Sequence, residues 1–594
     1  MIRTPLRPLA RIIQARARGE NPDAIERENL RLRHEEMHDR DRSRAEGRLL
    51  VLGAMFFCAF TLIGFRMGAL ASSEPAEPRA SAAGATILAG RADIVDRNGR
   101  ILATNIETHA LYAHPHQMID PQRAARELAQ IFPDLDAARL ERDFTGSRKF
   151  LWIKKRLSPE QQQAVMDIGD PGLLLGAREM RLYPNGRIAA HVMGGYGFGE
   201  EGVASAEVIG VAGVERKFDS RLRDPAQSDK PLVLSLDLGV QAAVERVLHG
   251  GMKLMNAKGA AAVLMDVKTG EVISLVSLPD FDPNDRPTPA LKGHPADSPL
   301  FNRAAQGLYE LGSTFKIFAA AQAIDLGLVN ARTEINTAPP LKVGGYTIGE
   351  FHNKNYGKLS VEQIIVKSSN RGSGKLALAI GHLRQREFLK SLGFLEPSPV
   401  ELSEASGSNP LIPARWTELS SVTISYGHGL SSTPLHLAAG YATIANGGIR
   451  VRPTLIKRDT PLKGAQVMSK STARIATQML RKVVTEGTAS FGEVEGYQVA
   501  GKTGTADKPK PSGGYYEDKV INTFAAIFPA NDPKYVLVLT LDEPVETSGR
   551  QPRRTAGWTS VPVAAEVIRR VAPLLGLRPQ IEPAKLTGIT LTSQ

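Results

Sequence analysis

Three short strings of residues in this chain supply the groups for acyl transfer by a serine nucleophile. They are Ser313-Thr-Phe-Lys316, Ser368-Ser-Asn370 and Lys502-Thr-Gly-Thr505, in that order along the chain. A serine hydroxyl is a poor nucleophile at neutral pH, so a nearby base must accept its proton during attack on a carbonyl. A buried lysine can be this base, because burial lowers its pKa and makes the neutral amine accessible.

The first string is predicted to lie at the start of a buried helix. Residues 314–324 lead to Gly327, and residues 317–328 are almost wholly apolar, which favours a helix inside a domain. Residues three apart on a helix share a face, so Ser313 and Lys316 are expected side by side. Amides at the helix N-terminus can support a developing oxyanion.

The second string is predicted to serve the leaving group and the substrate peptide. Ser368 and Asn370 lie in a polar break, residues 367–374, between two apolar helical stretches. The hydroxyl of Ser368 can relay a proton to a leaving group, and the Asn370 amide can hold a substrate amide. Alone, this string carries little information, because Ser and Asn are ordinary turn residues.

The third string is predicted to bind a carboxylate beside a sheet edge. It follows residues 497–501 and precedes two apolar runs, so we expect it to end an edge strand of an antiparallel sheet, where an extended peptide can pair. The residues predicted to hold a terminal carboxylate are Lys502, Thr503 and Thr505, while Gly504 is expected to let the ligand approach the backbone.

A second Lys-Thr-Gly string, residues 268–270, provides an internal comparison. It lies between two apolar runs, residues 260–265 and 271–276, which predicts the turn of a β-hairpin. It also precedes Ser313, whereas the predicted carboxylate site follows it. The ordered set of three strings, rather than any one of them, therefore indicates the chemistry.

In kind and order the strings resemble those of penicillin-binding proteins and serine β-lactamases. From about residue 88 to about residue 570 the chain also resembles class B penicillin-binding proteins. The matching segments are residues 91–99, 183–186, 210–215, 280–284, 302–304, 426–429 and 433–434. Residues 366–370 and those that follow are most similar to division-specific transpeptidases of the FtsI type. Departures at Ala92, Ser431 and Ser432 bear on the subfamily and touch no acyl-transfer group.

This resemblance implies a penicillin-binding, β-lactamase-like transpeptidase domain of the α/β (α+β) class, with an antiparallel sheet flanked by helices and an elongated N-terminal pedestal domain. It implies that Ser313 attacks the penultimate D-Ala carbonyl of a stem pentapeptide, with Lys316 as base and the amides of Ser313 and Thr505 facing the oxyanion. A second stem-peptide amine then forms a cross-link during septal cell-wall synthesis, and β-lactams acylate the same serine. No cofactor and no metal is implied.

Three other functions remain open from the sequence. An elongation-specific class B transpeptidase would use the same chemistry with different partners. A scaffold that activates a membrane glycan polymerase would need no acyl transfer. A β-lactamase is less favoured, because such enzymes rarely carry a membrane anchor and a pedestal. The resemblance further implies contact with an FtsW-like glycan polymerase and other division proteins.

The N-terminal region predicts one transmembrane helix, residues 49–71. Twelve arginines precede this span and glutamates follow it, so the positive-inside rule predicts a cytoplasmic N-terminus and a periplasmic bulk in the bacterial inner membrane, at the division septum by resemblance. A cleaved signal peptide is the competing interpretation, but 48 residues before the apolar run is long for a signal leader.

Composition agrees with a membrane-anchored enzyme of several domains. The chain has 594 residues and a formal charge of +12, spread too widely to indicate nucleic-acid binding. The single cysteine, Cys58, lies in the apolar span, which excludes a disulfide framework. The predicted parts are an Arg-rich cytoplasmic segment (1–48), an anchor (49–71), a linker (72–87), a pedestal domain (88–230), a transpeptidase domain (231–575) and a tail (576–594).

Overall fold

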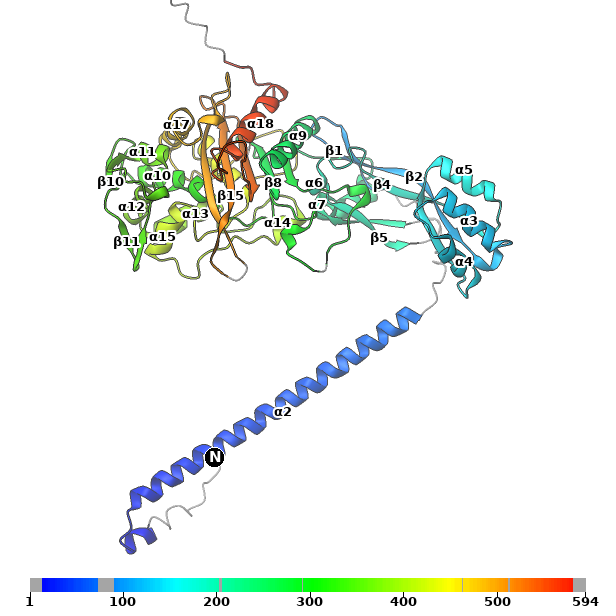
Figure 1. Cartoon of the computed structure of the whole chain (residues 1–594), viewed down its shortest axis with the longest axis horizontal. Coiled ribbons are helices and arrows are strands. Elements are labelled where there is room, and N and C mark those ends of the chain that lie inside the picture. Colours follow the sequence, from blue (N-terminus) through cyan, green and yellow to red (C-terminus); the bar gives the residue numbers. More distant parts are fainter. Residues whose placement is uncertain are drawn as a thin grey trace, which may run out of the picture. The chain divides into compact units, whose positions relative to one another are not determined.

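The computed structural model in Figure 1 describes residues 13–72, 90–201, 206–290, 292–461, 463–510 and 513–580. The chain divides into two compact units. The first comprises Met1–Glu77, Tyr112–Ile153 and Ala164–Leu174, and the second comprises Pro78–Leu111, Lys154–Gln163 and Leu175–Gln594. The predicted linker, except its first residue, and most of the predicted tail lie outside the described residues.

The longest helix of the first unit is α2, Pro22–Ser72. Within it, the segment Glu46–Gly68 is long and apolar enough to cross a membrane. Its large apolar side chains are exposed on all sides, as Leu50, Phe57 and Phe65 are at 75%, 72% and 78%. A helix that is apolar all round and unburied matches a lipid environment. The segment overlaps the predicted span, residues 49–71.

Two short helices of the first unit are capped at their N-termini by aspartate side chains. In α3 (Pro121–Ile131), the Asp120 carboxylate accepts a hydrogen bond from the Arg123 amide at 3.0 Å. In α4 (Ala137–Thr145), the Asp136 carboxylate likewise accepts from the Arg139 amide at 2.7 Å. Such caps satisfy amides that a helix N-terminus leaves without partners.

The part of the chain before the catalytic strings is built on a small sheet. Its strand order is β3-β2-β1-β7, with β4 also pairing with β2. The strands are β1 (Ile94–Val95), β2 (Ile101–Ala113), β3 (Leu151–Leu157), β4 (Leu173–Leu182) and β7 (Leu232–Val233). A separate antiparallel hairpin joins β5 (Gly195–Glu201) to β6 (Ala206–Ala212). Short helices α6 (Ala190–Met193), α7 (Gly213–Lys217) and α8 (Asp219–Leu222) flank the hairpin in sequence.

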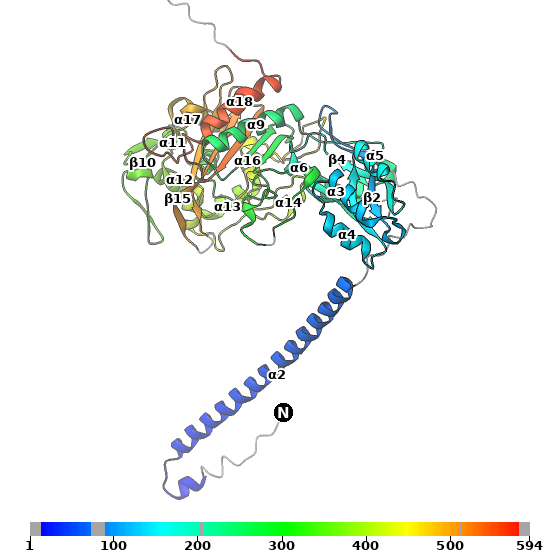
Figure 2. The ribbon, with the colours of Figure 1, turned by 45° about the vertical axis from the view of Figure 1, so that its right-hand side comes forward.

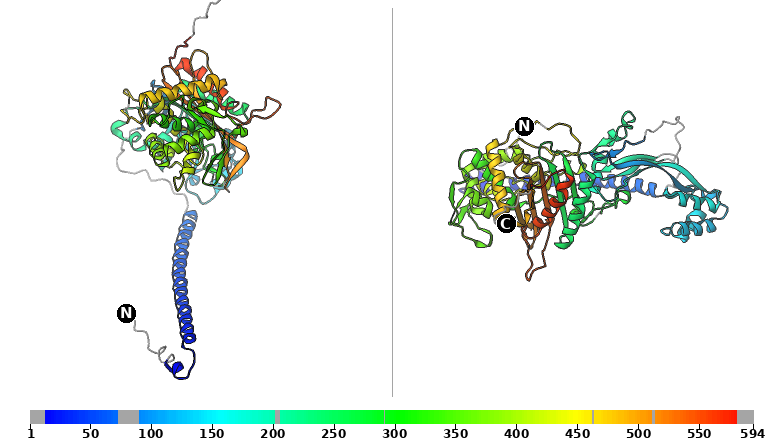
Figure 3. Two further views of the ribbon diagram at one scale, coloured as in Figure 1. Left: turned by 90° about the vertical axis from the view of Figure 1, so that its left-hand side faces the viewer. Right: turned by 90° about the horizontal axis from the view of Figure 1, so that it is seen from above.

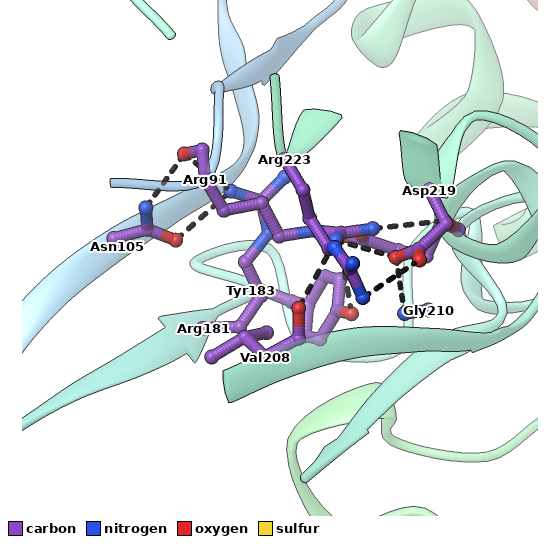
Figure 4. Close-up of polar contacts among 9 residues, drawn as sticks. Arg91, Asn105, Arg181, Tyr183, Val208, Gly210, Asp219 and Arg223 are labelled. Carbon is purple, nitrogen blue, oxygen red and sulfur yellow. Dashed lines mark hydrogen bonds and ion pairs between the residues drawn. The ribbon is translucent and has the colours of Figure 1, made fainter. Parts of the chain in front are cut away.

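A buried ion network ties these strands and helices together (Figure 4). The carboxylate of Glu215, whose side chain is fully buried, accepts hydrogen bonds from Arg91 Nε and Arg181 Nε, each at 2.7 Å. Arg91 also donates to Asp219 Oδ1 at 2.7 Å, and the same oxygen accepts from the Gly210 amide. Two of the segments that resemble class B penicillin-binding proteins, residues 91–99 and 210–215, therefore meet at one carboxylate cluster.

The catalytic strings belong to a domain built on a five-stranded antiparallel sheet, ordered β14-β15-β16-β8-β9. Its strands are β8 (Gly259–Asp266), β9 (Val272–Leu278), β14 (Ala500–Pro509), β15 (Tyr515–Phe528) and β16 (Tyr535–Asp542). The predicted antiparallel sheet is confirmed, as is the hairpin turn at residues 268–270 between β8 and β9. Strand β9 is buried along its whole length and β16 at every residue after the first, which requires cover on both faces.

Helices provide this cover, as predicted. α9 (Leu238–Leu254) and α18 (Ser560–Leu574) pack against each other and against the sheet. α16 (Pro434–Ala445) packs against β8, β15 and β16, and α17 (Lys470–Glu486) packs against β14. Figure 2 shows α9, α18 and α16 around the sheet, and in Figure 3 the yellow α17 lies beside the green helices that carry the catalytic strings. Two further helices of this domain are α13 (His382–Leu392) and α15 (Glu418–Ser425).

An aromatic cluster in the core supports the helix that follows Ser313. The rings of Phe315 and Phe318 lie 4.9 and 5.1 Å from that of Phe394, measured between centroids. The Tyr441 hydroxyl, fully buried, donates to the Thr314 carbonyl at 2.8 Å. Buried rings in such contact restrict movement, so this cluster holds the backbone around Ser313 in place.

A half-buried glutamate on α9, Glu245, makes the stability of this domain depend on pH. Glu245 accepts hydrogen bonds from the Ala189 amide at 2.8 Å and from Gln241 Nε2 at 2.9 Å. Burial nevertheless raises the pKa of Glu245 to about 7. A carboxyl whose pKa is raised by folding contributes stability that is present below its unfolded pKa and is lost as the pH rises through its folded pKa.

We therefore expect the free energy of unfolding to fall between pH 5 and pH 8, by roughly 1–3 kcal/mol through this group. The variant Glu245→Gln, which keeps an acceptor for the Ala189 amide but does not ionise, will lose most of this dependence. Denaturant unfolding of both proteins at pH 5, 6.5 and 8 measures the difference. Parallel pH profiles for the two proteins would contradict this assignment.

Candidate active site

Ser313 and Lys316 lie where a short 3-10 helix joins a buried α-helix. The 3-10 helix is η5, Gly312–Phe315, and Lys316 is the first residue of α10, Lys316–Asp325. Because a 3-10 helix has three residues per turn, residues i and i+3 lie on the same side. Ser313 is half-buried and Lys316 is only 1% exposed. The predicted buried helix is thus confirmed, with a tighter first turn than expected.

The amine of Lys316 is held in a dry, positively charged environment. Its Nζ donates to the Ser368 carbonyl at 2.5 Å and to the Ser368 hydroxyl at 3.1 Å. Burial, and then the charge of nearby Lys502, hold the pKa of Lys316 well below its usual range. The lowered pKa makes the neutral amine, which is the form that can accept a proton, more accessible than in an ordinary lysine.

Ser368 connects the three strings. It is the C-cap of α11 (Val361–Lys367) in a left-handed conformation, with φ 61° and ψ 43°. Its hydroxyl lies 3.1 Å from the Nζ of Lys316 and 3.0 Å from the Nζ of Lys502. A left-handed backbone at a residue other than glycine is uncommon and is often found at functional sites. Here it presents both the carbonyl and the hydroxyl to Lys316.

The polar break around Ser368 is shorter than predicted. It ends at Ser369, which caps α12 (Asn370–Ile380) by accepting a hydrogen bond from the Gly372 amide at 3.0 Å. Asn370 is therefore the first helical residue rather than part of a loop. Its side chain is half-buried and donates to the Gly349 carbonyl at 3.3 Å.

Glu350, which no sequence motif indicated, holds this turn in place. The buried Glu350 carboxylate accepts hydrogen bonds from the Ser369 hydroxyl, from the Asn370 amide at 2.8 Å and from the Arg371 amide at 3.1 Å. A carboxylate at a helix N-terminus stabilises the helix through its free amides and its dipole. Glu350 thus holds Ser368 and Asn370 in place from the loop before α11.

The third string lies on β14, which is an edge strand as predicted. The prediction that it ends the strand is wrong, because β14 runs from Ala500 to Pro509 and pairs with β15 along nearly its whole length. Pairing with the long strand β15 continues the ladder through the polar residues after Thr505. The site lies in the first half of the strand.

Side chains alternate along β14, so Thr503 and Thr505 share one face. The Thr503 hydroxyl lies 2.7 Å from the Thr488 hydroxyl, and Thr505 Oγ1 accepts from the Ala556 amide at 3.0 Å. Lys502 is fully buried, and burial lowers its pKa to about 7. An anion that binds beside Lys502 therefore raises the fraction of Lys502 in the ammonium form.

Glycines allow β14 to approach the backbone next to Ser313. A Cβ at Gly504 would lie 2.3 Å from the Leu311 carbonyl oxygen, and one at Gly312, which has φ 56°, would lie 2.9 Å from the Thr505 oxygen. A Cβ at Gly427 would lie 2.0 Å from the Gly312 oxygen. The sequence assigned Gly504 to ligand approach, whereas the structure shows that it is needed for the strand to reach the serine turn.

A polar and aromatic group next to Gly427 was also missed by the sequence. Glu310 accepts hydrogen bonds from the Gly429 amide at 2.6 Å and from the Tyr515 hydroxyl at 2.9 Å. The His428 ring lies 5.5 Å from that of Tyr426 and 6.5 Å from that of Tyr515. Burial, followed by the charge of Glu310, raises the pKa values of both tyrosines, that of Tyr426 to about 12.

Taken together, the three strings converge as the sequence predicted. Ser313 lies one turn before Lys316, whose buried amine has a lowered pKa. The Lys316 amine is hydrogen-bonded to the Ser368 hydroxyl, which is also hydrogen-bonded to the buried amine of Lys502. This arrangement can deprotonate a nucleophile, pass a proton to a leaving group and hold an anion beside β14. Within the described residues, no group of three His, Cys, Asp or Glu side chains is arranged as metal ligands would be.

Comparison with protein families gives two matches. Residues 86–229 match the penicillin-binding protein dimerisation domain, and residues 260–568 match the penicillin-binding protein transpeptidase domain. The second match alone covers about half of the chain and includes all three strings.

Curated relatives and solved structures agree with these matches. The chain is 32% identical to the probable peptidoglycan D,D-transpeptidase FtsI of Caulobacter vibrioides, with 92% of each chain covered. It is 29% identical to the FtsI transpeptidase of Escherichia coli K12, with 82% and 84% covered. Its fold is similar to that of penicillin-binding protein 3 from Mycobacterium tuberculosis in complex with aztreonam, with a TM-score of 0.62, 26% identity, and 83% and 97% covered.

Proposed function

Because the chain belongs to the class B penicillin-binding proteins, we propose that it is a peptidoglycan D,D-transpeptidase that cross-links stem peptides in the septal cell wall through an acyl-enzyme on Ser313. β-Lactams acylate the same serine. The observation that carries the proposal is the hydrogen-bonded set of Lys316, Ser368 and Lys502, in which two buried amines of lowered pKa flank one hydroxyl.

In the acylation step, Lys316 accepts the proton of Ser313 as its oxygen attacks the penultimate D-Ala carbonyl. The contact between the backbones of Gly312 and Thr505 supports an oxyanion site formed by the amides of Ser313 and Thr505. Ser368 then passes the proton to the departing D-Ala nitrogen, since its hydroxyl is hydrogen-bonded to the amine that holds the proton. The products are the Ser313 ester and free D-Ala.

Substrate binding is assigned to Asn370 and the β14 string. The Asn370 side chain orients the donor peptide at the mouth of the turn that Glu350 fixes. Thr503, Thr505 and Lys502 bind the terminal carboxylate, with Gly504 between the threonines. An anion there stabilises the charged form of Lys502, whose pKa of about 7 leaves it poised to gain a proton on binding.

The location of the enzyme follows from its topology. We assign Glu46–Gly68 as a single inner-membrane span, with the arginine-rich segment before it in the cytoplasm and the bulk in the periplasm. The division septum is proposed as its site of action, because FtsI is the name of the relatives to which it is similar. A glycan polymerase of the FtsW type is the proposed partner.

The test is a transpeptidation assay on the full chain in detergent. A stem-pentapeptide donor and an amine acceptor are incubated with the wild type or with Ser313→Ala, and products are separated by mass. We expect D-Ala release and a new amide only with the wild type. Expression of Ser313→Ala in cells depleted of the native protein separates the scaffold alternative, since normal division by this variant would favour a role independent of acyl transfer.

A further inference from the structure

An exposed aromatic and cationic surface lies next to the proposed carboxylate site. Phe491 and Trp558 are 52% and 41% exposed, and their ring centroids lie 5.0 Å apart. The guanidinium carbon of Arg553 lies 3.8 Å from the centre of the Trp558 ring. We call Phe491, Trp558 and Arg553 the aromatic–arginine surface. Large exposed rings cost free energy in water unless a ligand covers them, so such surfaces often bind partners.

This surface is linked by short stretches of chain to the two threonines of β14. Phe491 follows Thr488 by three residues, and the Thr488 hydroxyl lies 2.7 Å from that of Thr503. Trp558 follows Ala556 by two residues, and the Ala556 amide donates to Thr505 at 3.0 Å. The rings therefore lie within a few residues of the groups proposed to bind the substrate carboxylate.

The loop that carries Arg553 is held in shape and is positively charged. Glu546 and Arg553 exchange backbone hydrogen bonds of 2.9 Å in both directions, and their side chains form an ion pair at 3.5 Å. Arg550 and Arg554 lie in the same stretch, so residues 546–554 contain three arginines and one glutamate. The Arg553 side chain remains 39% exposed. The loop therefore attracts anionic peptides and keeps a donor free at its surface.

The second half-reaction, deacylation by an acceptor amine, indicates which ligand binds on this side of the site. In acylation the D-Ala amine leaves Ser313, and its carboxylate lies at Thr503 and Thr505. In deacylation an acceptor amine attacks the same carbonyl from the place the leaving amine vacated. An acceptor that carries a carboxylate beside its amine, as D-Ala does, would place it at the same threonines, and the rest of that acceptor would continue beyond them.

We propose that the aromatic–arginine surface is the binding site for the acceptor stem peptide, an inference that rests on the proposed function. The acceptor amine forms a C–N bond to the acyl carbonyl, the bond from that carbon to Ser313 Oγ breaks, and the amine proton returns to Ser313 through Lys316. Arg553 pairs with an acceptor carboxylate, while Trp558 and Phe491 pack against the peptide. Excluding water at this surface favours aminolysis over hydrolysis.

The experiment compares acceptors of two sizes on the same acyl-enzyme. Full-length protein in detergent is acylated with a thioester analogue of the donor peptide, and the ratio of aminolysis to hydrolysis is measured by mass spectrometry. The acceptors are a stem tetrapeptide with a free side-chain amine and D-Ala alone, which reaches only the threonines. The variants are Trp558→Ala and Arg553→Ala, with the conservative Trp558→Phe and Arg553→Lys.

We expect the alanine variants to lower the aminolysis ratio about fivefold or more for the tetrapeptide and less than twofold for D-Ala. The conservative variants should recover part of the loss. Leu383→Ala and Arg386→Ala, exposed on α13, are the matched controls and should change neither ratio. Fluorescent-penicillin acylation is recorded for each protein, so that a misfolded variant is recognised by loss of both reactions.

The proposal is overturned if the tetrapeptide ratio stays within twofold in both alanine variants, or if the ratios for both acceptors fall equally. Should Trp558→Ala fail to fold, the ratio in Trp558→Phe and the Arg553 variants decides by the same criterion. A wild-type protein that forms no acyl-enzyme at all would refute the proposed function itself, and this result differs from a selective loss of acceptor use.

Discussion

Replacement of Lys316 with methionine will lower the rate of Ser313 acylation by about 10²–10⁴-fold, the usual contribution of a general base. Methionine fills a similar volume, so the buried site around α10 should stay packed. The variant loses the amine that is hydrogen-bonded to Ser368 and whose pKa burial has lowered. Stopped-flow acylation with a chromogenic cephalosporin, on full-length protein in detergent, measures the rate.

The pH dependence of the acylation rate in the wild type tests the same assignment, because the direction of the change is also predicted. A lysine base works only when it is neutral, and a lowered pKa extends the neutral form toward lower pH. Acylation should therefore slow as the pH drops below the pKa of Lys316, and this fall in rate should occur well below the usual pH range of a lysine. The Lys316→Met variant should not show this fall in rate at low pH.

The control for this variant is Lys390→Met, an exposed lysine on α13, which should leave acylation unchanged. If Lys316→Met kept acylation within tenfold of the wild type while remaining folded, another group would have to be the base. If the acylation rate of Lys316→Met still fell at low pH as in the wild type, the same conclusion would follow.

Removal of the Glu215 carboxylate will destabilise the protein by about 3–5 kcal/mol, the range for a broken buried ion pair. The Glu215 carboxylate is fully buried and accepts hydrogen bonds from Arg91 Nε and Arg181 Nε at 2.7 Å each. Arg181, which lies beside Arg91 in Figure 4, is itself fully buried. In Glu215→Ala both guanidinium groups lose the carboxylate that offsets their burial. The remaining partner of Arg91, Asp219, can compensate only in part.

Denaturant unfolding followed by tryptophan fluorescence and circular dichroism measures this loss. Glu215→Gln should fall between the alanine variant and the wild type, because an amide oxygen still accepts a hydrogen bond but carries no charge. Glu387→Ala, an exposed glutamate on α13, is the matched control and should change stability by less than about 0.5 kcal/mol. A Glu215→Ala protein as stable as this control would show that the network contributes no net stability.

Local patterns were sufficient to predict the elements that carry the site. Apolar runs predicted α10 and the strands of the large sheet, and the apolar stretches on either side of a turn predicted the hairpin at residues 268–270. The three strings were placed together by their order along the chain and by family resemblance. In the structure, hydrogen bonds from Lys316 and Lys502 to Ser368 bring them into contact.

Contacts between distant residues account for what sequence reasoning missed. Glu350 lies 19 residues before Ser369, Thr488 lies 15 before Thr503, and Glu310 lies 205 before Tyr515. Each is a common polar residue outside any motif, so no local signal distinguishes it. The length of β14 and the role of Gly504 were likewise hidden, because both depend on segments that approach from elsewhere in the chain.

The most direct test of the account is covalent labelling of Ser313 by fluorescent penicillin in the full-length protein, read by gel and intact mass beside Ser313→Ala. We predict one stable adduct per wild-type chain and none on the folded variant. Rapid penicillin hydrolysis without an adduct would indicate a β-lactamase. A stable adduct that persists in Ser313→Ala would contradict the assignment of Ser313 as the nucleophile.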